Sequence, residues 1–272
     1  MRARALTAAD TESVLAALAA EPVKNVFIAS RVENGVLARQ ATGTVYGWPG
    51  RRPHSFLHVG TNLVPASAGD DCLPAFVEAA GKRRVTQSIV GESRLVLPLW
   101  DGLSRRWGRS WSAIRELRGI QPLLAISQDP LVESDSRVQP VTWKDFDSYY
   151  GAATAMYREE VGGVPPREGY ASYCRWLIST GRSYGIVSDG QVVFKTDVGA
   201  TAGGVAQVQG VWLHPDLRGQ GRSAPAMAAV VRQVRQRHPT VSLYVNSYNT
   251  RALRLYERVG FTQVGEFATV LY

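Results

Sequence analysis

An apolar stretch that runs into a glycine-rich turn, Val211 to Ser223, carries the clearest chemical signal in this chain. Gly219 and Gly221 allow unusual backbone angles and close approach of a ligand. A turn that opens a helix leaves N–H groups unpaired at the positive end of the helix dipole, and Arg218 and Arg222 add charged donors. The pattern predicts a cradle for an anion, most naturally a phosphate or a pyrophosphate.

Two common phosphate-binding motifs are excluded by the spacing in this turn. No Gly-Lys-Ser/Thr follows, as a Walker loop requires. The segment from Arg218 to Ser223 also lacks the full G-x-G-x-x-G spacing of a dinucleotide fingerprint. Pro225 suits the first turn of the following helix, where its missing N–H costs little. Taken alone, the turn is also compatible with an ordinary strand-to-helix connection whose arginines are solvated.

A second segment, Asn249 to Phe261, has the pattern of a short capped helix. Asn249 suits the N-cap and Gly260 suits a left-handed C-cap. Apolar and aromatic residues recur at helical spacing and are core residues in the simplest interpretation; they are Ala252, Leu255, Tyr256 and Val259. By itself this helix needs no function beyond packing.

Together the two segments resemble the GNAT superfamily of acyl-CoA-dependent N-acetyltransferases. The family's R/Q-x-x-G-x-G/A loop, which follows its fourth strand and binds the CoA pyrophosphate, is matched by Arg218, Gly221 and Ser223. Ser223 stands where the family has Gly or Ala. The family's N-x-x-A-x-x-L-Y-x-x-x-G-F pattern is matched from Asn249 to Phe261. The resemblance covers about residues 137–272.

The resemblance implies acetyl-CoA as co-substrate and a primary amine that attacks the thioester directly, with no metal. Backbone groups of Val211, Trp212 and Leu213 would pair with the pantetheine arm. The residues implied to hold the pyrophosphate form one run; they are Arg218, Gly219, Gln220, Gly221, Arg222, Ser223 and Ala224. Asn249 would hydrogen-bond the pantetheine or its phosphate end, and Tyr256 would protonate the leaving thiolate.

The sequence offers several candidates for the general base. Many family members carry a carboxylate on or near the fourth strand, where this chain has Gln207 and Gln209, neither of which takes a proton. The candidate bases are therefore elsewhere in the chain; they are Asp197 on the preceding strand, Glu159, Glu160 and His214. Each is also explained as a solvated or acceptor-recognition residue. A water chain, or an acceptor of low pKa, would remove the need for a base.

The elements expected around these residues make an α/β fold, a mixed sheet with helices on both faces. A polar break at 128–136 separates an expected N-terminal domain, 1–127, from an expected GNAT domain, 137–272. The second domain has the order β-α-α-β-β-β-α-β-α-β, with a hairpin turn at Asp189-Gly190. The first has the order α-α-β-β-α-β-α-β and is interpreted as a degenerate copy in a tandem arrangement.

A closer resemblance is to an actinobacterial group of GNAT proteins with an additional, uncharacterised N-terminal domain. The stretches that carry it are 21–31, 192–195 and 207–212. No second R-x-x-G-x-G occurs before residue 128, so the N-terminal domain is not expected to bind acyl-CoA in the same way.

Composition is that of a soluble globular protein, with 45% hydrophobic residues and no apolar run of the roughly 18 residues that span a membrane. We therefore expect no membrane partner. The first twenty residues suit an amphipathic helix better than a signal peptide. Cys72 and Cys174 have no metal-ligand spacing and suit buried thiols in a reducing cytoplasm.

The net charge of +8 leaves the partner open, because nucleic acid and polyanionic small molecules both attract basic proteins. Runs of basic and aromatic residues at 82–84 and 105–109 are more simply solvated helix ends than an RNA surface. Besides a cytoplasmic acyltransferase, the sequence allows two other functions. One is a non-catalytic acyl-CoA sensor, suggested by Gln207 and Gln209, and the other is an RNA-associated protein. A homo-oligomer is compatible with the sequence.

Overall fold

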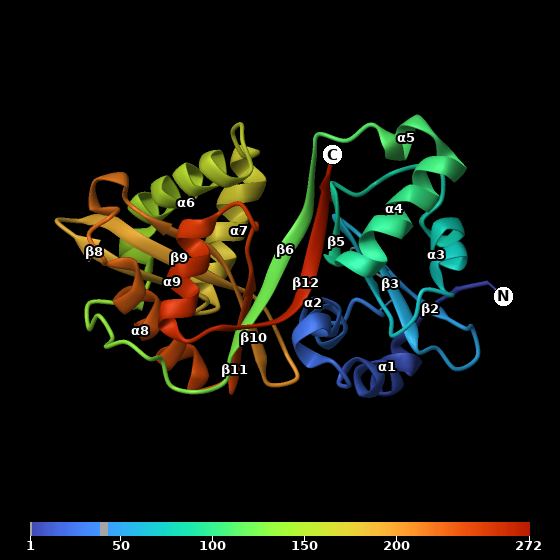
Figure 1. Ribbon diagram of the computed structural model, residues 1–272, viewed down its shortest axis with the longest axis horizontal. Coiled ribbons are helices and arrows are strands. Elements are labelled where there is room, and N and C mark those ends of the chain that lie inside the picture. Colours follow the sequence, from blue (N-terminus) through green and yellow to red (C-terminus); the bar gives the residue numbers. More distant parts are fainter. Residues whose placement is uncertain (1, 39–42) are drawn as a thin grey trace. The chain divides into compact units, whose positions relative to one another are not determined.

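A computed structural model of the chain describes residues 2–38 and 43–272 (Figure 1). The chain divides into two compact units that are not continuous in sequence. Unit 1 consists of Met1–Leu124, Tyr244–Asn249 and Gln263–Tyr272, and unit 2 consists of Ala125–Leu243 and Thr250–Thr262. Each unit combines helices with a β-sheet, which confirms the expected α/β class.

Unit 1 has a sheet in the order β1-β2-β3-β4-β5-β12-β6. Its strands are β1 (Arg4–Ala5), β2 (Thr44–Trp48), β3 (Ser55–Val59), β4 (Asn62–Ala66), β5 (Ser88–Glu92), β6 (Glu116–Ile126, which ends in unit 2) and β12 (Thr262–Leu271). Its helices are α1 (Thr11–Leu18), α2 (Pro22–Glu33), α3 (Leu73–Ala80), α4 (Ser93–Trp107) and α5 (Arg109–Ser112). Phe56 packs with the core under α1 and α2, and its neighbour Leu57 packs with the core under α3 and α4, so helices cover both faces.

Unit 2 has a sheet in the order β11-β10-β9-β8-β7. Its strands are β7 (Gln139–Pro140), β8 (Ser183–Ser188), β9 (Gln191–Ala202), β10 (Val205–Leu213) and β11 (Thr240–Tyr244). Its helices are α6 (Phe146–Glu160), α7 (Arg167–Ser179), α8 (Ser223–Arg235) and α9 (Thr250–Val259). The hairpin between β8 and β9 turns at Asp189 and Gly190 with positive φ at both, as the Asp-Gly pair predicts.

Two sequence expectations about unit 1 were wrong. Pro98 predicts a break in a helix over 94–107, but α4 continues through Pro98 without one. Strand β4 was not expected, and Pro65 within it argues against a central strand. Pro65 lies beyond Asn62 and Leu63, the two residues that pair with β5, and it is in register with Leu57 of β3.

The two halves of the chain repeat one order of elements. With the short 3-10 helices and α5 set aside, β1 to β6 and β7 to β12 both read β-α-α-β-β-β-α-β-α-β. The turn after the fourth strand differs between them: in unit 1 it contains Asp70 and Asp71, and in unit 2 it contains Arg218 and Arg222. The first half therefore has the same architecture but carries negative charge where the second carries positive charge.

The last strand belongs to unit 1, which differs from the contiguous 137–272 domain expected from sequence. β12 pairs antiparallel with β5 from Phe267↔Glu92 to Leu271↔Ser88. Ala268 and Val270 are fully buried in the core under α3 and α4. Backbone pairing and burial thus tie the end of the chain to its N-terminal half.

We predict that Val270→Ala destabilises unit 1 by about 1–3 kcal/mol, because it removes buried methyl groups and leaves a cavity. Hydrogen exchange at the amides of β5 and α4 measures the loss. Val264→Ala, on the same strand but 44% exposed, is the matched control and should change little. Faster exchange confined to unit 2 would contradict this assignment of β12.

Candidate functional site

The turn between β10 and α8 has the geometry of an anion cradle. Gly219 and Gly221 both have positive φ (+79° and +75°), and a Cβ added at either would meet no atom within 4 Å. α8 begins at Ser223 with no side chain capping its N-terminus. In the described chain, no intramolecular hydrogen bond uses the N–H groups of residues 219–224. These donors are open to a ligand at the positive end of the helix dipole.

Arg218 is held beside this turn by the protein itself. Its Nε donates to the Leu213 carbonyl (2.9 Å), and its Nη2 donates to the Glu159 carboxylate (2.8 Å to Oε2). Glu159 also accepts a hydrogen bond from the Trp212 indole (3.1 Å). Glu159, expected as a candidate base, is therefore engaged with two donors, and much of the charge of Arg218 is already compensated.

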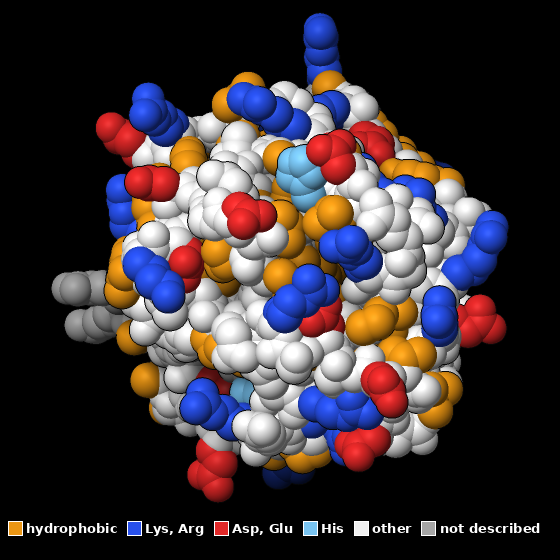
Figure 2. All heavy atoms as spheres, turned by 90° about the vertical axis from the view of Figure 1, so that its left-hand side faces the viewer, with side chains coloured by type: hydrophobic (Ala, Val, Ile, Leu, Met, Phe, Trp, Pro, Cys, Tyr) orange, Lys and Arg blue, Asp and Glu red, His pale blue; other side chains and the backbone are white. Residues whose placement is uncertain are grey.

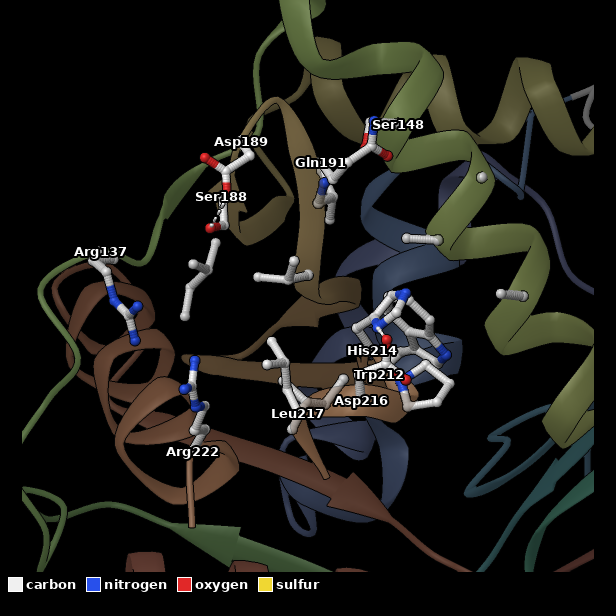
Figure 3. Close-up of a pocket in the computed structure, with 18 of the residues that line it drawn as sticks. Arg137, Ser148, Ser188, Asp189, Gln191, Trp212, His214, Asp216, Leu217 and Arg222 are labelled. Atoms are coloured by element: carbon white, nitrogen blue, oxygen red, sulfur yellow. Dashed lines mark hydrogen bonds and ion pairs between the residues drawn. The ribbon is translucent and has the colours of Figure 1, made fainter. Parts of the chain in front are cut away.

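Arg222 differs from Arg218, because no ion pair of the described residues includes it. It lines a cavity of about 730 Å³ that borders the turn, and its side chain points toward Arg137 (Figure 3). Asp135 binds Arg137 (2.6 Å). The Arg137 hydrogen bond lowers the pKa of Asp135, and Arg222 contributes to this shift, so the cluster of two guanidinium groups and one carboxylate is net positive.

The cavity lies entirely within unit 2. α6, the β8–β9 hairpin and the end of β10 contribute its walls, which Figure 3 shows with Ser148, Gln191, Trp212 and His214. On this side of the molecule acidic and basic side chains are interspersed around a hydrophobic hollow (Figure 2). Such a surface suits a small ligand with both polar and apolar parts.

Strands β10 and β11 separate next to this region. They pair in parallel only from Val205↔Thr240 to Gln207↔Ser242, although β10 continues to Leu213. Gln207 Nε2 and Ser242 Oγ, at the last pair, are buried without a hydrogen-bond partner among the described residues. Beyond them, within unit 2, the β11-facing edge of β10 has no strand partner. Val211 to Leu213 lie on this edge.

Tyr256 on α9 is buried, being 6% exposed, and its ring packs edge-on against Phe261. Burial raises the pKa of Tyr256 above its ordinary value, and the nearby Glu160 carboxylate raises it further. The hydroxyl is therefore a proton donor throughout the neutral range. Gly260 has φ of +109° and ends the helix, as the C-cap pattern predicts. Asn249 directly precedes α9, is exposed and belongs to unit 1.

Asp197 is buried and fully engaged. Its Oδ1 accepts hydrogen bonds from the hydroxyls of Tyr149 (2.7 Å) and Ser183 (2.8 Å), and its Oδ2 accepts one from Lys195. Lys195 was not among the expected site residues. A sequence signal for it existed, because Lys195 and Asp197 stand two apart in a strand and so share one face.

The remaining polar candidates lie on the surface. His214 is half-exposed and 3.7 Å from Asp216. Gln209 donates to the Tyr173 hydroxyl at 2.6 Å. No group of three metal-ligating side chains occurs among residues 2–38 and 43–272. No helix in the same ranges is long and apolar enough to cross a membrane.

Two family models match adjoining parts of the chain. Residues 146–261 match the acetyltransferase (GNAT) family, and residues 43–149 match a domain of unknown function, DUF4081. The acetyltransferase Atu2258 of Agrobacterium fabrum is 38% identical over 68 residues, which are 25% of this chain. The match spans about half (49%) of that relative's length.

Solved structures share the fold at low identity. A GCN5-related N-acetyltransferase from Sphaerobacter thermophilus has a TM-score of 0.63 and 16% identity, over 98% of this chain and 94% of its own. A tandem GNAT protein from the clavulanic acid biosynthesis pathway has a TM-score of 0.57 and 18% identity, over 98% and 97%. The expected GNAT fold, with an N-terminal α/β domain in tandem, is thus confirmed.

We predict that Glu159→Gln tightens binding of inorganic pyrophosphate up to about fivefold, because it frees Arg218 from a partly exposed ion pair worth at most about 1 kcal/mol. Isothermal titration calorimetry measures the change. Asp129→Asn removes the carboxylate from another arginine of unit 2, Arg235, and serves as the control. Weaker binding in Glu159→Gln would mean that the Glu159 contact holds Arg218 in its binding position.

Proposed function

We propose that this chain, through its GNAT acetyltransferase domain at residues 146–261, transfers an acetyl group from acetyl-CoA to a primary amine. The observation that carries the proposal is the open run of N–H groups at residues 219–224, beside the unpaired guanidinium of Arg222. The match to the acetyltransferase family supports the same reaction class.

The described residues fit the phosphates and the arm of CoA. In our proposal the pyrophosphate lies over the amides of Gly219 to Ala224, with Arg222 as its charged neighbour and Ser223 as a further donor. The pantetheine arm runs along the β11-facing edge of β10 and pairs with Val211 to Leu213 like an added strand. Asn249 belongs to unit 1, and the hydrogen bond to the arm that the sequence suggests for it stays a prediction.

The reaction needs placement more than activation of the thioester. The amine nitrogen of the acceptor forms a bond with the thioester carbonyl carbon, and the C–S bond breaks. A backbone N–H of β10 stabilises the carbonyl oxygen as it gains negative charge. Tyr256 donates its proton to the departing sulfur, and the proton lost by the amine goes to a base.

Glu160 is the carboxylate that we assign to the acceptor side. Asp197 already accepts from three donors, and Glu159 is bound to Arg218 and Trp212. Glu160 is exposed and lies close enough to Tyr256 to influence its pKa. It takes the amine proton directly or through water, or it holds the acceptor as an ammonium ion.

A non-catalytic acyl-CoA-binding protein is the second candidate. Two observations favour it: β10 carries Gln207 and Gln209 in place of a carboxylate, and the buried Asp197 is saturated with donors. CoA binding without thiol release over a broad panel of amines would select this candidate. An RNA-binding role has less support, because charges of both signs are interspersed on the face shown in Figure 2.

We further place the protein in the cytoplasm and in the actinobacterial group with an additional N-terminal domain. Its two cysteines, Cys72 and Cys174, are buried free thiols, which suits a reducing compartment. The match of residues 43–149 to a domain of unknown function supports the additional N-terminal domain.

We predict that acetyl-CoA raises the melting temperature of the protein, because a ligand that binds only the folded state stabilises it. In Arg218→Ala/Arg222→Ala the shift should fall by at least half, since charged donors to the phosphates are lost. Arg237→Ala, beyond the other end of α8, is the control. An unchanged melting temperature at saturating acetyl-CoA would overturn the proposed function.

We predict that Tyr256→Phe lowers kcat about 100-fold while the thermal shift by acetyl-CoA is kept, because only the proton donor is removed. The raised pKa keeps Tyr256 protonated, so the wild-type rate should fall only above pH about 10, the ordinary tyrosine value. Steady-state rates of thiol release measured against pH test both points. Full activity in Tyr256→Phe would exclude it as the acid.

A further inference from the structure

Lys195 is a charged side chain in the core of unit 2. Its side chain is 0% exposed and that of its partner Asp197 is 4% exposed. Lysine is almost never fully buried unless it is paired, because the charge loses its water. The pair is fixed from the far side by Tyr149 and Ser183, whose hydroxyls donate to Asp197 Oδ1.

This ion pair lies against an irregular position in β10. The register between β9 and β10 shifts between Gln209 and Trp212, and Gly210 has φ of +59°. A Cβ on Gly210 would come within 3.0 Å of Lys195 Nζ and 2.9 Å of Met156 Cε. The Lys195 ammonium and the Gly210 backbone are therefore in close contact, with no room for a side chain between them.

The same short segment is braced by two other side chains. Thr196 Oγ1 donates to the Gln209 carbonyl at 3.1 Å, and Tyr173 accepts from the Gln209 carboxamide at 2.6 Å. Val211 and Trp212 follow directly. β9 and α7 thus hold in place the part of β10 that precedes the backbone groups assigned to the thioester.

We propose that Lys195, held by Asp197, is a positioning residue for acyl transfer: it keeps the bulge at Gly210 in the shape that aims the Val211 backbone groups at the thioester. This inference rests on the proposed acetyl transfer. Stability alone does not require an ion pair here, since replacing buried ion pairs with apolar side chains is often neutral or stabilising. The directional hydrogen bond to Asp197 fixes the ammonium at one point, which an apolar side chain cannot do.

The test is the double variant Lys195→Met/Asp197→Leu, which removes both charges at similar volume and leaves Tyr149 and Ser183 able to bond each other (3.0 Å). We expect an unchanged melting temperature, kcat lowered 10- to 100-fold because the reacting groups are misplaced, and KM for acetyl-CoA within threefold. A folded double variant with kcat within twofold of wild type would overturn the proposal.

If the double variant does not fold, the kcat of Gly210→Ala tests the positioning role instead. Gly204→Ala is its matched control, because Gly204 also has positive φ (+76°) but its Cβ would meet only Pro239, at 3.7 Å. We expect kcat to fall at least tenfold in Gly210→Ala and to stay near wild type in Gly204→Ala. Equal kcat values in both variants would overturn the positioning role.

If the wild-type protein transferred no acetyl group, the proposed function would be wrong. The claim that the Lys195–Asp197 pair holds the bulge at Gly210 could still be tested. In that case a crystal structure of the double variant tests it. We expect loss of the register shift between Gln209 and Trp212. A bulge that persists with positive φ at Gly210 would show that the ion pair does not hold it.

Discussion

The separation of β10 from β11 is the constraint on which the rest of unit 2 depends. The two strands are parallel neighbours for three residue pairs, after which β10 runs on to Leu213 with one edge unpaired. Parallel neighbours need a crossover, and α8 supplies it. The turn into that helix therefore lies at the end of the unpaired edge. An open backbone edge and an uncapped helix N-terminus next to each other suit a long ligand with phosphate at one end.

Some charged and polar groups in this region have partners within the protein, and others have none among the described residues. Arg218 is bound to Glu159, and the buried Lys195 is bound to Asp197, so neither offers a full charge to a ligand. Arg222 and the amides of residues 219–224 have no such internal partners in the described chain. The contrast explains why two arginines four residues apart in one turn are not equivalent, although both are charged donors in the sequence.

The two halves of the chain share an order of elements but differ in the charges of one turn. Both follow the same order of strands and helices, and both have a turn after the fourth strand. The first half places Asp70 and Asp71 in that turn, and a pair of carboxylates repels phosphate. The shared order of elements therefore does not by itself provide an anion site, because anion binding depends on the side chains and amides of the turn.

Features that depend on neighbours along the chain can be predicted from the sequence. The cradle, the Asp189-Gly190 hairpin and the α9 helix with its Gly260 cap follow from turn chemistry and periodicity over a few residues. The other features depend on tertiary contacts: the pairing of β12 with β5, the ion pair between Glu159 and Arg218, and the burial of Asp197 beside Lys195. Most of these contacts join residues tens to more than a hundred positions apart, and burial of Lys195 and Asp197 depends on the helices packed over them. Local patterns do not encode which distant backbone edge or side chain will be the partner.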